Sequence, residues 1–112
     1  MAASLEPIYR LTFTTPESWS VQLPGVDGSE GQSFLIAEGR AEGGVAGRMR
    51  AANAPRRRVD GVLTPDFRGA LETDDGATIV FAWSGLTQAA DDGPRHITGG
   101  ITHVTDDARY AW

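Results

Sequence analysis

Apolar and polar residues alternate with a period of two along most of this sequence, and the spacing of an amphipathic helix is nearly absent. In residues 6–14, for example, Tyr9, Leu11 and Phe13 alternate with polar residues. Successive side chains of a strand point to opposite faces, so this segment is predicted to be a half-buried strand. Because the pattern recurs downstream, the chain is predicted to be all-β.

Turn signals separate the alternating segments. Gly43-Gly44, Asp60-Gly61 and Asp74-Asp75-Gly76 are typical of tight hairpins, because glycine accepts positive φ angles. Pro16 is expected to end the first strand, and Pro55 is expected to break the ladder. Loops are expected at residues 24–31 and 88–94. The expected strands cover about residues 6–14, 19–23, 32–42, 45–53, 56–59, 62–73, 77–84 and 95–105.

The length of 112 residues corresponds to one domain, residues 1–112. About eight strands joined by short turns predict an antiparallel meander with little or no helix. An open sheet leaves edges that aggregate, so we expect the meander to close into a small β-barrel.

Composition excludes several classes of function. The chain has no cysteine, which removes disulfides, thiolate metal sites and cysteine nucleophiles. A net charge of −5 argues against nucleic acid as a partner. The first residues do not resemble an export signal, and no apolar run approaches the ~20 residues that span a bilayer. We therefore expect a cytoplasmic protein with no membrane partner.

Charged residues suggest a catalytic group. Asp66 and Arg68 share one face of the expected strand at 62–73, and Glu42 lies on a neighbouring strand where Glu38 and Arg40 alternate in the same way. If these faces point into the barrel, Asp66 and Glu42 can exchange protons while Arg68 and Arg40 hold a carbonyl or carboxylate. The alternative is a solvated face with an ion-pair ladder, which is favoured for Glu38.

Several other side chains are candidates for a ligand pocket. Tyr9, Phe81 and Trp83 can line the interior of a barrel, although most aromatic residues belong to the core. His103 can act as a lone acid or base, or as a structural histidine. Further aromatic candidates are Phe13, Trp19 and Phe67.

No cofactor or metal is expected. His96 and His103 are seven residues apart, so one continuous strand places them on opposite faces, where they cannot chelate the same ion. No serine lies in the Gly-x-Ser-x-Gly motif of a nucleophile elbow. The glycine-rich stretch at 42–47 lacks the lysine and the following helix of a phosphate-binding loop. An arginine cluster at residues 48–58 can meet acidic ligands or a partner's carboxylates, but a charged strand and edge protected against aggregation is the favoured interpretation.

Three segments carry a recognisable pattern: Leu5–Leu11, Gly39–Gly43 with Gly47, and Arg58–Ile79, which contains Asp-Gly, Asp-x-Arg and Asp-Asp-Gly-Ala-x-Ile. Together these segments resemble the bacterial and fungal family called domain of unknown function 3237. The resemblance covers most of residues 5–112 and implies a small antiparallel β-barrel. It implies no settled activity, although the Asp-x-Arg pair that recurs in the family favours a role for Asp66 and Arg68.

Two segments depart from the family pattern. Between Ala51 and Arg56 the chain lacks the expected Gly-Gly-Ala-Asp-Trp segment. Asp106–Trp112 resembles the segment that introduces the family's final strand, and here the sequence stops. An unpaired edge invites pairing, so we expect an open groove or a homo-oligomer at that position.

The leading hypothesis is therefore a β-barrel that binds a small carbonyl-bearing or aromatic molecule, with activity as a cofactor-free isomerase, lyase or cyclase. The alternative is a non-catalytic structural or oligomerisation module. A cavity with a polar lip favours the first, whereas a filled apolar interior favours the second.

Overall fold

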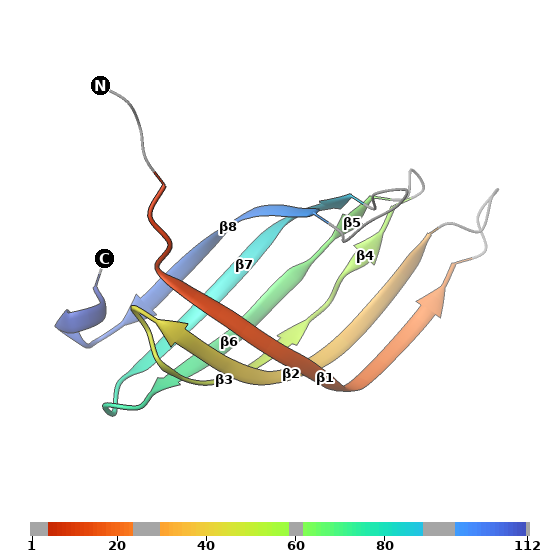
Figure 1. Ribbon diagram of the computed structural model, residues 1–112. Helices are drawn as coiled ribbons and strands as arrows, with labels where there is room; N and C mark the ends of the chain where they lie inside the picture. The colour runs from red at the N-terminus through yellow and green to blue at the C-terminus, as the bar shows by residue number, and fades with distance from the viewer. Residues whose placement is uncertain (1–4, 24–29, 59–61, 89–95, 112) are drawn as a thin grey trace, which may run out of the picture.

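A computed structural model describes residues 5–23, 30–58, 62–88 and 96–111. Most of these residues form one antiparallel sheet, which confirms the all-β class (Figure 1). The strands are β1 (Tyr9–Gln22), β2 (Gly31–Gly43), β3 (Gly47–Asn53), β4 (Arg56–Arg57), β5 (Leu63–Thr64), β6 (Asp66–Thr73), β7 (Thr78–Gln88) and β8 (His96–Thr105). The expected turn at Asp60-Gly61 and most of the expected loops at 24–31 and 88–94 lie outside the described residues.

The register shows that β3 and β4 behave as one interrupted strand, as do β5 and β6. Asn53 of β3 pairs with Phe67 of β6. Arg56 of β4, which is three residues after Asn53, pairs with Thr64 of β5, which is three residues before Phe67. The two ladders therefore share one register, and Pro65 marks the interruption because proline has no N–H to donate. The strand expected at 62–73 is thus present but divided.

This continuity defines how the sheet is ordered. Hydrogen-bonded pairs run through β2, β3, β6, β7, β5 and β4 and return to β2. That ring arises from the two interrupted strands and does not form a barrel. Among the described residues, β1 pairs with β2 alone and β8 pairs with β7 alone, so these two strands are the edges of a meander (Figure 1). The structure therefore supports the meander but not its expected closure.

The first strand is longer than its sequence predicts. We expected Pro16 to end it and a separate strand to begin near Trp19, but β1 continues through both positions. The register against β2 shifts between Thr14 and Glu17, which marks a bulge around the proline. A bulge on an edge strand needs no N–H at that point, so β1 accommodates Pro16 there.

The core lies on one face of the curved sheet. Nine buried apolar side chains lie there, with Tyr9, Leu11, Trp83 and Tyr110 packed against them. The nine are Ala37, Ala41, Val45, Met49, Ala51, Phe67, Leu71, Ile79 and Phe81. Two of the predicted turns are present, with φ of 119° at Gly43 and 93° at Gly76.

The C-terminal segment is anchored to the β6–β7 turn. A short 3-10 helix, η1 (Ala108–Tyr110), follows Asp107, whose side chain accepts a hydrogen bond from the Arg109 backbone N–H. Tyr110 Oη donates to Asp75 Oδ2 at 2.6 Å, and Arg109 Nη1 donates to the same oxygen at 3.0 Å. No helix in the described part of the chain has the length and apolarity needed to cross a membrane.

One close approach between strands requires glycine. A Cβ added at Gly39 of β2 would lie 2.0 Å from the carbonyl oxygen of Thr12 in β1, whereas a Cβ at Gly100 would meet nothing within 4 Å. We expect Gly39→Ala to lower the free energy of unfolding by roughly 1–3 kcal/mol because the backbone must shift. Gly100→Ala is the control, expected to stay within about 0.5 kcal/mol. Urea unfolding measures both, and equal effects would contradict the packing argument.

Candidate functional site

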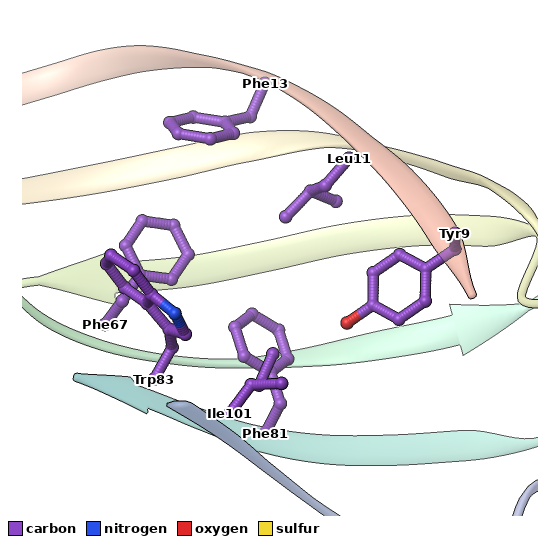
Figure 2. A pocket seen from close by; sticks show the side chains of 7 residues that line it. All are labelled: Tyr9, Leu11, Phe13, Phe67, Phe81, Trp83 and Ile101. Atoms are coloured by element: carbon purple, nitrogen blue, oxygen red, sulfur yellow. The ribbon is translucent and has the colours of Figure 1, made fainter. Parts of the chain in front are cut away.

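An apolar pocket of about 320 Å³ lies on the core face, between β1 on one side and β7 and β8 on the other (Figure 2). Its walls come from four strands. The lining residues are Tyr9, Leu11 and Phe13 of β1, Phe67 of β6, Phe81 and Trp83 of β7, and Ile101 of β8. The pocket is therefore bounded by both edge strands of the sheet.

Alternation explains this lining, because only every second residue of each strand faces the pocket. Phe67 and Phe81 are buried and form the floor, with ring centroids 5.9 Å apart. Phe13 extends over Phe67 at 5.5 Å and stays 46% exposed, and Ile101 is 42% exposed. The pocket thus has a buried aromatic floor and an exposed apolar rim.

A hydrogen bond between side chains joins the two edge strands at one end of the pocket. Tyr9 Oη lies 2.9 Å from His103 Nε2, and the two rings meet edge to face with centroids 5.8 Å apart. Burial raises the pKa of Tyr9 and lowers the pKa of His103. Both shifts favour the uncharged forms, so the pair is a neutral polar group in apolar surroundings.

The structure brings four of the predicted site residues together. Tyr9, Phe81 and Trp83 line the pocket, and His103 bonds to Tyr9. Arg40 lies elsewhere: it is exposed and forms an ion pair with Asp74, which raises its pKa. The expected binding role of Arg40 thus has no support from its position.

The three predicted catalytic residues do not meet in the pocket. Asp66 and Arg68 are exposed on the opposite face of β6 from Phe67, where Arg68 Nε donates to Asp66 Oδ1 at 3.2 Å. Glu42 is exposed near the C-terminal end of β2. In the sheet this end lies beside the C-terminal end of β6, whereas Asp66 lies at the N-terminal end of β6. Alternation places charges and aromatic side chains on opposite faces, so a catalytic role for these three stays an unsupported prediction.

The outer face of β2, β3 and β6 instead carries a ladder of ion pairs. Arg48 Nη2 lies 3.1 Å from Glu72 Oε1, and Arg50 Nη2 lies 3.9 Å from Glu38 Oε1. A second depression, of about 360 Å³, lies among these residues and is lined by Glu38, Arg48 and Arg50. All of these side chains are more than half exposed, so each pair contributes about 0–1 kcal/mol.

The sequence did not lead us to expect Leu11 and Ile101 in the pocket lining, and Trp19, which we named as a candidate, does not line the pocket. Ile101 lies two residues before His103 on the same face of β8, so alternation alone could have identified it. Trp19 lies beyond the bulge and packs on Phe34, with centroids 5.9 Å apart. Within the described ranges no cluster of three potential metal ligands exists.

The lowered pKa of His103 predicts a loss of stability in acid. A folded-state pKa below the ordinary 6.5 means that the unfolded chain takes up the proton first. The free energy of unfolding should therefore be unaffected by His103 above pH 6.5 and should fall as the pH drops from 6.5 to the folded-state pKa. Urea unfolding across this range, compared with His103→Gln, tests this. An equal slope in both proteins would contradict it.

Comparison of the chain with protein-family models, with curated proteins and with solved structures gave no match. The resemblance to domain of unknown function 3237 therefore stays a prediction.

Proposed function

We propose that this protein binds a small, largely apolar molecule in the pocket between β1 and β8. The observation that carries the proposal is a pocket with a buried aromatic floor and an exposed apolar rim, between two strands that do not pair with each other in the described part of the chain. A volume of about 320 Å³ lies at the lower end of the range for small-molecule pockets. An apolar lining with a single polar pair at one end is also typical of such sites.

The exposed rim favours binding over a purely structural role. Phe13 and Ile101 remain 46% and 42% exposed, although they adjoin a buried core. Covering apolar surface contributes roughly 25 cal/mol per Å², so a ligand that reaches both rim residues gains from this area. The lining contains no carboxylate, and turnover as an isomerase, lyase or cyclase would have to use Tyr9 or His103.

An acidic substitution at the rim tests the proposal. Titration with a neutral fluorescent dye such as N-phenyl-1-naphthylamine should show one site per chain, and Ile101→Asp should weaken its affinity at least about tenfold, because a carboxylate in the pocket must be desolvated. The matched control is Val104→Asp, on the same strand but the opposite face, where Val104 is 66% exposed. Its affinity should match wild type. Equal losses in both variants, or no saturable binding, would overturn the proposal.

We also propose self-association through the free edge of β8 as a second function. Strand β8 contains no Asp, Glu, Lys, Arg or Pro. Edge β1, in contrast, carries Arg10, Pro16, Glu17 and a bulge, which are devices that prevent edge pairing. The contrast favours β8 as the edge that pairs with a second copy of the chain, in an antiparallel two-fold arrangement.

Lysine substitutions on β8 and, as a control, on β1 test whether β8 is the edge that pairs. Wild type should show the mass of a dimer by light scattering, and the double variant Thr98→Lys/Thr102→Lys should show that of a monomer. Pairing β8 with a second β8, face matched to face, brings these like charges near one another. The control, Thr12→Lys/Thr14→Lys on β1, should remain dimeric. A monomeric wild type, or a dimer that survives the β8 change, would refute pairing at this edge.

A further inference from the structure

We infer that the Tyr9–His103 pair makes the pocket selective for a neutral aromatic molecule that carries one hydrogen-bonding oxygen, a hydroxyl or a carbonyl. This inference rests on the proposed function and adds the chemistry of the ligand. The Tyr9–His103 pair is a polar group in an otherwise apolar lining. It is therefore expected to determine which of several ligands of similar size binds most tightly.

The phenol of Tyr9 retains hydrogen-bonding capacity after its bond to His103. The hydroxyl carries one O–H and two acceptor lone pairs, and the 2.9 Å bond to His103 Nε2 uses one of these. If Nε2 is protonated, Tyr9 accepts from it and keeps its O–H for a ligand carbonyl. If Nε2 is unprotonated, Tyr9 donates to it and keeps a lone pair for a ligand hydroxyl. Figure 2 shows the Tyr9 oxygen directed into the space among the lining side chains.

The rest of the lining supplies stacking surface. Phe67, Phe81 and Trp83 present aromatic rings from adjacent strands. An aromatic ring that lies against these side chains gains both buried area and favourable ring contacts.

Charge complementarity excludes ions as preferred ligands. None of the lining residues is Asp, Glu, Lys or Arg, and the neighbouring charged side chains Arg10 and Arg68 are exposed on the opposite faces of β1 and β6. An ionic group in the pocket would lose its water without gaining a counter-charge. Tyr9 and His103 both have pKa shifts toward their neutral forms, which is consistent with an uncharged site. Carboxylate ligands, which Arg68 and Arg40 were expected to hold, are thus disfavoured.

Three probes with the same naphthalene ring test this selectivity near neutral pH: 2-naphthol, 2-methylnaphthalene and 2-naphthoate, each measured by displacement of the dye. A net hydrogen bond is worth about 1 kcal/mol, so 2-naphthol should bind roughly fivefold more tightly than the hydrocarbon. The anion should bind at least about tenfold more weakly than 2-naphthol. Tight binding of 2-naphthoate, or equal affinity for all three probes, would overturn the inference.

A matched pair of variants assigns the selectivity to one hydroxyl. Tyr9→Phe removes the pocket hydroxyl and should abolish the preference for 2-naphthol, while the affinity for 2-methylnaphthalene stays within about twofold of wild type because the ring remains. Tyr110→Phe removes the other described phenol, which bonds to Asp75 outside the pocket, and should keep the preference.

The outcomes separate this inference from the proposed function. A preference that persists in Tyr9→Phe would refute the role of the hydroxyl, although saturable binding of the hydrocarbon would leave the pocket itself supported. Failure of the dye and all three probes to bind would refute the pocket together with the inference. The hydrocarbon also reports whether Tyr9→Phe keeps the pocket intact, since its binding uses no polar group.

Discussion

The unpaired edges of β1 and β8 are the constraint on which the rest of this structure depends. Both strands contribute aromatic or aliphatic side chains to one face, but no backbone ladder joins them among the described residues. The Tyr9–His103 hydrogen bond links the edges through side chains at one end. Elsewhere the two edges stay apart, and the pocket between them has a buried aromatic floor and an exposed apolar rim.

The strands were predictable from sequence because alternation is a local property. Residues 32–42 and 45–53 match β2 and β3 closely, since a Gly-Gly turn and regular alternation agree there. The bulge at Pro16 was not predictable in this way: proline usually ends a strand, and only the edge position of β1 makes it tolerable. Closure was predicted from the general cost of open edges, which does not say whether two particular edges meet.

The site was harder to predict because alternation divides a strand into two faces without relating distant strands. Asp66 and Arg68 were correctly placed on one face of residues 62–73, but a catalytic role required that face to point inward. Phe67 and Leu71 on the other face are buried, and burial of these side chains decides the orientation. Likewise, Tyr9 and His103 are 94 residues apart, so their contact follows from the curvature of the sheet and not from any local pattern.

The two proposed functions share β8, and this links them thermodynamically. Ile101 forms the rim of the pocket, while the backbone of the same strand is the edge proposed to pair with a second copy. A strand added to β8 extends the sheet past Ile101 and changes how much of the rim is exposed to water. Any ligand whose affinity depends on that exposure must shift the association equilibrium by the same factor, because coupling between two binding events is reciprocal. The proposed ligand binding and the proposed self-association therefore depend on the same edge strand.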